Sequence, residues 1–233
     1  MGKKRLKNES FFVAKRVGRA VHEFEMLPND CRAVVALSGG PVSLTMLRAM
    51  LYRERWAPTN ATYLPVHVPD SVHGENDAVV EVLRRQVAQW GLELTVLASA
   101  AAAGHYHPVP HARLLQEAAV ALDAEVIVLG QTVLDRALAV LMPMLLEGQL
   151  AGLPEVEELA AVRIARPLCH TTAEAVLNMA CVEGLPMLEP VPHPQAAVRA
   201  TVLDHLVAKK GDLIEQLRNA SNAPQNITDE YMA

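Results

Sequence analysis

Aromatic and cysteine residues are scarce in this sequence. Aromatic side chains make up 4% of the 233 residues, whereas 51% of the residues are hydrophobic and 20% are charged. Few aromatics among many small aliphatic residues favour helices packed on a parallel sheet over a β-sandwich. The three cysteines, Cys31, Cys169 and Cys181, have no C-x-x-C spacing. We therefore expect isolated core thiols, as in a reducing cytoplasm.

Long apolar segments are lacking as well. No run reaches the roughly 18–20 residues that span a bilayer, and the first residues lack the continuous apolar segment of a signal peptide. We expect a cytoplasmic protein with no membrane partner. The formal net charge of −5 argues against nucleic-acid binding by the whole surface.

Positive charge is concentrated in residues 1–19. This segment holds seven lysines and arginines and a single acidic residue, Glu9. Such a basic segment can contact RNA phosphates. The alternative interpretation is a terminus that only increases solubility.

The segment Ser38-Gly39-Gly40-Pro41-Val42-Ser43 carries the strongest local signal. It follows the apolar run of residues 33–37 and precedes the helix-forming run of residues 44–51, which predicts a strand, a tight glycine turn and a helix. Glycines can adopt positive φ and turn backbone N–H groups toward an anion, and the following helix directs its positive end to the same place. We predict a phosphate-binding loop, and a turn that binds nothing is the alternative.

Strands and helices alternate along the chain. Strands are expected at residues 33–37, 61–68, 92–97, 125–129 and 162–165, and helices at residues 9–26, 43–55, 76–90, 112–122, 172–183 and 195–220, with one more that ends near residue 146. This order predicts an α/β fold with a doubly wound parallel five-stranded sheet and added N- and C-terminal helices. The expected divisions are residues 1–30, a basic arm and helix, residues 31–194, the α/β domain, and residues 195–233, C-terminal helices and a tail.

In sheets of this type, ligands bind beyond the carboxyl ends of the strands, where the strand order reverses. The loops after the first and fourth strands, Ser38–Ser43 and Gly130–Asp135, are therefore the candidate site.

Together these segments resemble the PP-loop ATP pyrophosphatase superfamily, which has an adenine nucleotide α-hydrolase-like fold. The branch of tRNA 2-thiocytidine synthetases is the most similar. The family loop Ser-Gly-Gly-x-Asp-Ser corresponds to residues 38–43, and its Gly-His-His-x-Asp-Asp corresponds to residues 130–135. The family's Arg-Pro-Leu and Gly-Leu-Pro recur at residues 166–168 and 184–186. The resemblance implies ATP-dependent adenylation of a tRNA base, followed by attack of sulfur.

The resemblance assigns the nucleotide-binding positions, for ATP or AMP, to Ser38, Gly39, Gly40, Ser43, Gly130 and Asp135. Val42 replaces the family's aspartate, and Mg²⁺ requires hard oxygen ligands that valine lacks. Gln131, Thr132 and Leu134 replace histidine and aspartate. Asp135 remains, either as an anchor for a metal or loop or as an ordinary acid at a helix N-terminus. These changes argue against Mg²⁺-dependent adenylation.

The two cysteine pairs that hold an iron–sulfur cluster in the thiocytidine branch are also replaced, so we do not expect this cluster. Both regions instead read Pro-Val-Pro-His, at residues 108–111 and 190–193. One hypothesis is a replacement site for Zn²⁺ or a similar metal. Its ligands would be His105, His107, His111 and His193. The alternative is surface histidines on two rigid proline-rich loops.

The sequence therefore predicts a divergent PP-loop protein that binds adenine nucleotide or phosphate and has lost adenylation and iron–sulfur chemistry. Two alternatives stay open: a pseudoenzyme that acts as a partner- or metal-binding module, and an active tRNA-modifying enzyme with altered chemistry. Arg163, Arg166 and the basic N-terminus are candidates for holding RNA phosphates. The resemblance suggests a homodimer, and another protein partner is possible.

Overall fold

The structure, a computed structural model, describes residues 8–69, 77–97, 108–148, 152–159 and 162–187. The contacts within the chain define two compact units. One comprises Met1–Thr132 and Glu155–Pro194, and the other Val133–Pro154 and Gln195–Ala233. The helix expected at residues 195–220 lies outside the described residues.

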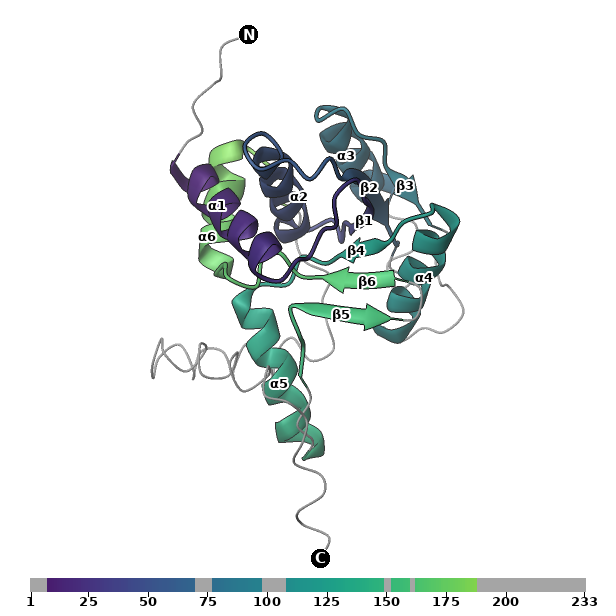
Figure 1. Cartoon of the computed structure of the whole chain (residues 1–233), viewed down its shortest axis with the longest axis vertical. Coiled ribbons are helices and arrows are strands. Elements are labelled where there is room, and N and C mark those ends of the chain that lie inside the picture. Colours follow the sequence, from purple (N-terminus) through teal and green to yellow (C-terminus); the bar gives the residue numbers. More distant parts are fainter. Residues whose placement is uncertain (1–7, 70–76, 98–107, 149–151, 160–161, 188–233) are drawn as a thin grey trace, which may run out of the picture. The chain divides into compact units, whose positions relative to one another are not determined.

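The first unit contains a six-stranded sheet with the order β3-β2-β1-β4-β6-β5 (Figure 1). Its strands are β1 (Arg32–Ala36), β2 (Thr62–His67), β3 (Thr95–Val96), β4 (Val126–Val128), β5 (Val156–Leu159) and β6 (Val162–Ala165). All neighbours pair in parallel except β5, which is antiparallel to β6. The prediction of a doubly wound parallel sheet is confirmed, with one strand more than expected.

Strand β5 escaped prediction because it has no apolar run. Glu157 and Glu158 interrupt any apolar pattern in this segment. Charged side chains are tolerated there because β5 lies at the edge of the sheet, where its side chains are only partly covered. Charged side chains on an edge strand also discourage pairing with other chains.

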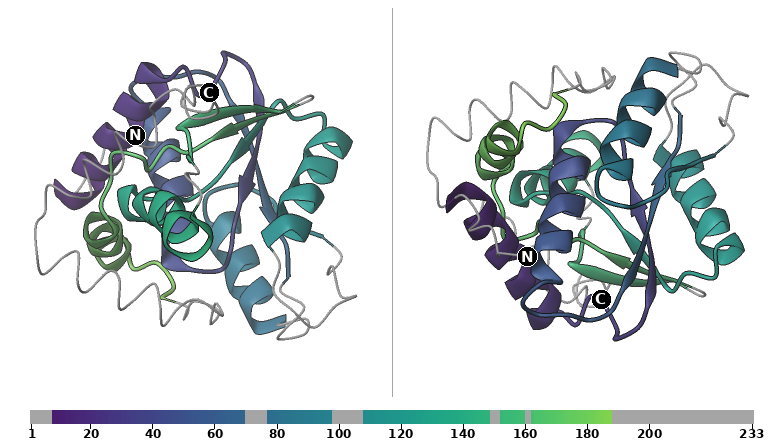
Figure 2. Two further views of the ribbon diagram at one scale, coloured as in Figure 1. Left: turned by 90° about the horizontal axis from the view of Figure 1, so that it is seen from below. Right: turned by 90° about the horizontal axis from the view of Figure 1, so that it is seen from above.

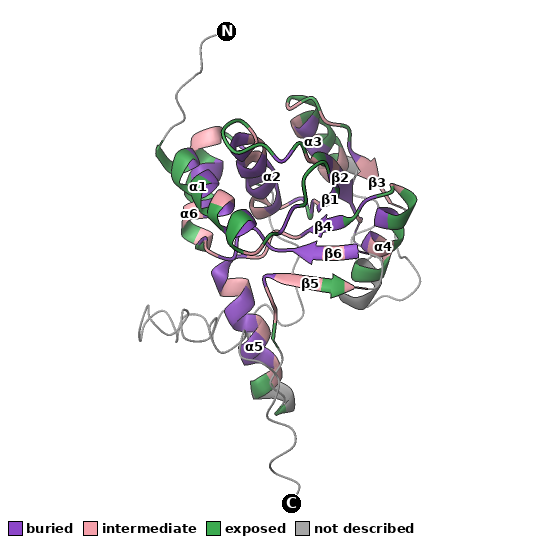
Figure 3. Cartoon of the chain, in the orientation of Figure 1, coloured by how far each residue is buried: buried purple, intermediate pink, exposed green. Residues whose placement is uncertain are grey.

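Helices cover both faces of this sheet. The first unit contains α1 (Asn8–Glu23), α2 (Pro41–Arg53), α3 (Asp77–Ala88), α4 (Pro108–Ala121) and α6 (Ala173–Glu183). Ala33 and Val35 of β1 belong to the core formed with α1, α2, α3 and α6, whereas Val34 faces the core formed with α4. Figure 2 shows α4 across the sheet from α1, α2 and α6. Burial is greatest along α2 and the central strands, and the outer face of α1 is exposed (Figure 3).

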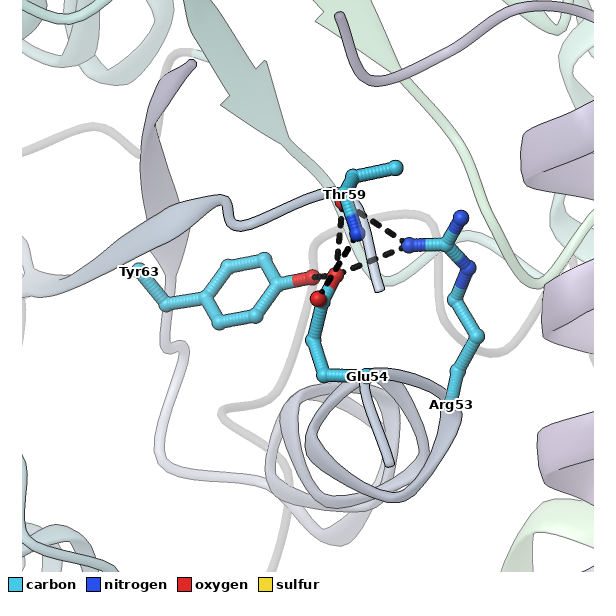
Figure 4. A network of polar contacts seen from close by, with 4 residues as sticks. All are labelled: Arg53, Glu54, Thr59 and Tyr63. Atoms are coloured by element: carbon cyan, nitrogen blue, oxygen red, sulfur yellow. Dashed lines mark hydrogen bonds and ion pairs between the residues drawn. The ribbon is translucent and has the colours of Figure 1, made fainter. Parts of the chain in front are cut away.

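Polar contacts fasten the end of α2 to the start of β2 (Figure 4). The Glu54 carboxylate accepts hydrogen bonds from the Tyr63 hydroxyl at 2.9 Å and from the Thr59 hydroxyl and backbone N–H at 2.6 and 2.9 Å. Arg53 forms an ion pair with Glu54 at 2.8 Å. Burial and the Glu54 charge raise the pKa of Tyr63. These contacts fix the direction in which the chain enters β2.

The second unit includes α5 (Val133–Glu147), which is followed by a glycine, Gly148, with φ of 67°. Arg136 is fully buried and donates from Nε and Nη2 to the Leu153 carbonyl at 2.9 and 2.7 Å. This bidentate contact ties the residues after α5 back to the helix. Within the described residues, no helix is long and apolar enough to cross a membrane.

Glu183 joins the three helices α1, α2 and α6. Its carboxylate accepts hydrogen bonds from the Ser10 hydroxyl and from the Tyr52 hydroxyl at 2.5 Å, and Arg48 lies 3.5 Å away as an ion-pair partner. Burial raises the pKa of Glu183, but the hydrogen bonds from Ser10 and Tyr52 and the charge of Arg48 outweigh burial, so this pKa lies below its ordinary value of 4.5.

A carboxyl group whose pKa falls on folding stabilises the protein above its unfolded pKa, and this contribution is lost as pH falls through the folded pKa. Glu183→Gln should therefore lower the free energy of unfolding by about 1–2 kcal/mol at pH 7. The difference from wild type should shrink as pH falls below the ordinary value of 4.5 and through the lowered pKa of Glu183. Urea unfolding across this pH range measures both effects, with the exposed Glu93→Gln as control. A difference that persists unchanged at pH 3 would contradict the role of the charge.

Candidate functional site

The reversal of strand order lies between β1 and β4. These strands pair in parallel with Val34 opposite Ile127, so they end at the same edge of the sheet. The loop after β4 passes directly beside the start of α2. A Cβ atom on Gly130 would lie 3.3 Å from Ser43 Cα and 3.5 Å from Ser43 N, so only a glycine fits there without displacing the backbone. The structure thus brings Gly130 and Ser43 together.

The loop between β1 and α2 depends on Gly39. This residue has φ of 91°, and a Cβ atom there would come within 2.8 Å of Val79 Cγ1. Gly40 is the N-cap of α2 and has extended backbone angles, and Pro41 occupies the first helical turn, where proline is well tolerated. The N–H groups of Val42 and Ser43 lie in the first turn of α2, whose donors have no partners within the helix. They are available to an anion.

Two serine hydroxyls close this loop. Ser43 Oγ accepts a hydrogen bond from Ser38 N at 3.2 Å and donates to the Gly40 carbonyl at 3.0 Å. Ser38 Oγ lies 3.3 Å from Ser43 Oγ. Ser43 is buried and Ser38 is exposed. Ser43 therefore holds the loop in shape, and Ser38 presents the hydroxyl that a ligand can reach.

His67 supports the base of the same loop, and sequence reasoning missed it. It is the last residue of β2, it is buried, and its Nδ1 lies 2.6 Å from the Leu37 carbonyl. Because a carbonyl only accepts, Nδ1 carries the proton in this contact. The Leu37 N–H in turn donates to Val66 O at 2.8 Å. The available signal was a single histidine ending an apolar strand beside the predicted loop.

Arg166 and Arg163 both have hydrogen-bond partners within the protein, and their expected contact with RNA stays a prediction. Arg166 is buried, and it donates from Nε to Gln131 Oε1 at 2.7 Å and from Nη2 to Glu157 at 2.8 Å. Arg163 donates to Glu158 at 2.7 Å and to the Glu25 carbonyl at 2.7 Å. Arg166 therefore orients the Gln131 amide in the loop after β4.

Asp135 lies in the first turn of α5, in the second unit. Its position there fits an acid at a helix N-terminus. A part for Asp135 in the nucleotide site stays a prediction.

The cysteines only partly match expectation. Cys31 and Cys169 are buried, as expected, but Cys181 is exposed, because it lies on the outer face of α6 with Leu177. The expectation that Cys181 is a buried thiol is therefore wrong. Burial raises the pKa of Cys31 to about 11, with a further contribution from the charge of Glu125.

The proposed histidine ligands fall mostly beyond the described residues. His105, His107 and His193 lie outside them, and His111 is in α4 with its side chain undescribed. Residues 108–111 form the first turn of α4 rather than the expected rigid loop, because proline is well accommodated at a helix start. In the part of the chain that is described, no three His, Cys, Asp or Glu side chains form a metal-binding group.

The histidine hypothesis predicts metal bound to the purified protein. Elemental analysis under non-chelating conditions should find about one zinc per chain, and His107→Ala or His193→Ala should each reduce this content at least about tenfold. His22→Ala, a change of an exposed histidine on α1, is the matched control. Wild-type protein without bound metal would refute the hypothesis.

The loop geometry predicts that alanine substitutions at two neighbouring glycines differ in their effect on stability. Gly39→Ala should lower the free energy of unfolding by about 1–3 kcal/mol and weaken anion binding, because it forces an alanine into positive φ against Val79. Gly40→Ala should change stability by less than about 1 kcal/mol, since its backbone angles suit any residue. Urea unfolding measures the free energy of unfolding of both variants. Equal destabilisation by the two substitutions would contradict this description of the loop.

Known proteins of related sequence and structure support a common origin. The profile of the PP-loop domain family matches residues 13–190, more than half of the chain. The tRNA-cytidine(32) 2-sulfurtransferase of Pseudoalteromonas atlantica is 21% identical over 199 residues, which cover 79% of this chain and 62% of that protein. Its namesake from Citrifermentans bemidjiense is 31% identical over 84 residues, 36% of this chain and 33% of the relative. The chain thus spans less than two thirds of the length of these relatives.

Solved structures share the fold at low sequence identity. The U34-tRNA thiolase NcsA from Methanococcus maripaludis, determined with its 4Fe–4S cluster, has a TM-score of 0.76 and 18% identity, covering 94% of this chain and 81% of its own. The NMN synthetase from Francisella tularensis has a TM-score of 0.51 and 12% identity, covering 94% and 95%. With the glycine loop at the reversal of strand order and the family match across residues 13–190, these findings establish that the chain belongs to the PP-loop family.

Proposed function

We propose that this chain binds the phosphates of an adenine nucleotide in the loop Ser38–Ser43, that it interacts with tRNA, and that it no longer catalyses adenylation. The observation that carries the proposal is the glycine-lined cradle where β1 and β4 end. Gly39 holds a positive φ and Gly130 packs against the backbone of Ser43. Both features permit close approach of phosphate to backbone N–H groups.

The cradle fits a phosphate group through three kinds of donor. The free N–H groups of Val42 and Ser43 begin α2, whose dipole favours an anion at this end. The exposed Ser38 hydroxyl is a further donor. In this proposal Ser43 and His67 maintain the loop, because each is committed to a loop carbonyl.

The residues around the cradle do not fit the magnesium ion that adenylation requires. A metal offsets charge on the pyrophosphate leaving group and needs oxygen ligands. Val42 offers none, and it packs against the main core instead. The Gln131 oxygen is already hydrogen-bonded to the guanidinium of Arg166, whose positive charge opposes a second cation there. These contacts support nucleotide binding without turnover.

The cysteines do not fit an iron–sulfur cluster. Cluster ligands are thiolates and come in sets, whereas Cys31 and Cys169 are buried separately in the core region and Cys181 is exposed on α6. The pKa of Cys31, about 11, keeps that thiol protonated at neutral pH. The proposal therefore includes no sulfur chemistry of the thiolase type.

Transfer RNA is the proposed macromolecular partner. The relatives with the names tRNA-cytidine(32) 2-sulfurtransferase and U34-tRNA thiolase act in its modification, and residues 1–19 supply positive charge in an otherwise acidic chain. In this proposal residues 31–194 bind the nucleotide and the N-terminal segment contributes to RNA binding.

Titration calorimetry with ATP and with AMP tests nucleotide binding. Wild-type protein should bind with and without Mg²⁺ equally well, because no magnesium ligand contributes. Ser38→Ala should weaken binding about tenfold through loss of one donor to phosphate, and Gly130→Val should weaken it more by crowding Ser43. Thr62→Ala, a change of an exposed hydroxyl at the start of β2, should leave binding unchanged. Wild-type protein that binds neither nucleotide would overturn the proposal.

A pyrophosphate-release assay with ATP, Mg²⁺ and bulk tRNA tests the loss of adenylation. Wild-type protein should release no pyrophosphate above the no-enzyme background. Release that depends on tRNA and disappears in Ser38→Ala would instead identify an active tRNA-modifying enzyme.

A further inference from the structure

Three aromatic side chains form an exposed group at one end of α2. Phe11 and Phe12 lie in the first turns of α1 and are 45% and 58% exposed, and Trp56, just beyond α2, is 46% exposed. The ring of Phe11 lies 5.8 Å from that of Phe12 and 6.1 Å from that of Trp56. We call Phe11, Phe12 and Trp56 the aromatic patch. Because only 4% of the residues are aromatic, the exposure of three neighbouring aromatic side chains distinguishes this part of the surface.

The aromatic patch is not required for packing α1 onto the protein. The buried stripe of α1 consists of Val13, Ala14, Val17, Ala20 and Val21, at helical spacing. Phe11 and Phe12 lie outside this stripe, on the face that Figure 3 shows as exposed. Exposed apolar patches are common on surfaces that bind a partner.

Three positively charged side chains lie beside the aromatic patch. Lys15 and Arg16 follow Phe11 and Phe12 by one helical turn and are exposed, and Arg55 precedes Trp56 and is exposed. The Arg55 guanidinium lies 5.4 Å from the Tyr52 ring. Among the described residues, none of these three cations has an ion-pair partner. The surface therefore offers flat rings for stacking and unpaired cations for phosphate.

This combination is the one that binds unpaired nucleotides, because bases stack on aromatic rings while cations contact the backbone. We propose that the aromatic patch, with Lys15, Arg16 and Arg55, is a docking surface for an unpaired region of RNA. The proposal deepens the proposed function, since it rests on tRNA as the partner. A protein surface or a second copy of this chain would be a different occupant, and the experiment below separates them.

The docking surface is remote from the nucleotide loop. The loop precedes Pro41 at the start of α2, and Trp56 follows its end at Arg53. A helix of 13 residues is about 20 Å long. The aromatic patch thus anchors the RNA at a distance from the phosphate cradle. Substitutions in the patch should consequently change RNA affinity and leave nucleotide affinity intact.

Fluorescence anisotropy with end-labelled bulk tRNA tests this docking surface. Phe12→Ala and Trp56→Ala should each weaken binding about 5- to 100-fold, in line with the stacking of one base on one ring. Lys15→Glu with Arg16→Glu should weaken binding and flatten the slope of log K against log salt by about 1.4–1.8, through the loss of two phosphate contacts. An unstructured single-stranded RNA should compete better than a blunt duplex of equal length.

Matched controls lie on α4. Val120→Ala removes an exposed apolar side chain and Arg113→Glu reverses an exposed charge, and both should leave tRNA affinity unchanged. All substituted side chains are exposed, so urea midpoints should stay near that of wild type. Equal loss of affinity in the α4 variants would overturn the assignment of RNA binding to the patch.

Trp56 also provides a direct optical readout. Trp90→Phe leaves Trp56 as the only tryptophan in the chain, and its fluorescence should be quenched by a saturating amount of single-stranded RNA. No quenching, combined with unchanged tRNA affinity in Trp56→Ala, would refute the proposal. Unchanged tRNA affinity accompanied by conversion of an oligomer to a monomer in sedimentation analysis would instead make the patch a protein interface.

The two proposals can fail independently. If the aromatic patch variants lose tRNA but keep wild-type affinity for ATP, both proposals stand. If the wild-type protein binds tRNA through the patch and does not bind ATP or AMP, the nucleotide proposal fails and the docking surface remains.

Discussion

The parallel pairing of β1 with β4 is the constraint on which the rest of the structure depends. Its register places Ala33 opposite Val126 and Val35 opposite Val128, so both strands end at the same edge of the sheet. Apolar side chains on both faces fix this register, because a shift by one residue would exchange the two cores. The packing of Gly130 against Ser43 follows from this pairing.

In the proposed function, the atoms that bind phosphate belong to the backbone and do not depend on the side chain at position 42. The cradle of Ser38–Ser43 depends on backbone angles and N–H groups, which a substitution at Val42 does not alter. Val42 also packs against the main core, so an apolar side chain at this position stabilises the first turn of α2. The amide of Gln131, held by Arg166, lies in the loop after β4.

Much of the fold could be predicted from local patterns. The continuous apolar run of residues 33–37 identified β1, strands were also expected at the positions of β2 and β4, and the capping residue Thr172 with Gly184 marked both ends of α6, as the structure confirms. Strand β5 could not be predicted, since its partner β6 and not an apolar pattern makes it a strand. The start of α4 at Pro108 was missed because proline is typical of loops and of first helical turns alike.

The sequence by itself determined the fold class, the glycine loop and its family, because these depend on short-range periodicity and on motif order along the chain. Only the tertiary structure decided which side chains surround the loop. His67 reaches the Leu37 carbonyl from β2, and Arg166 is committed to Gln131 and Glu157. The aromatic patch is likewise a tertiary feature, since Phe11 and Trp56 meet only where the start of α1 passes the end of α2. Contacts between residues distant in sequence are set by packing, and local patterns do not encode them.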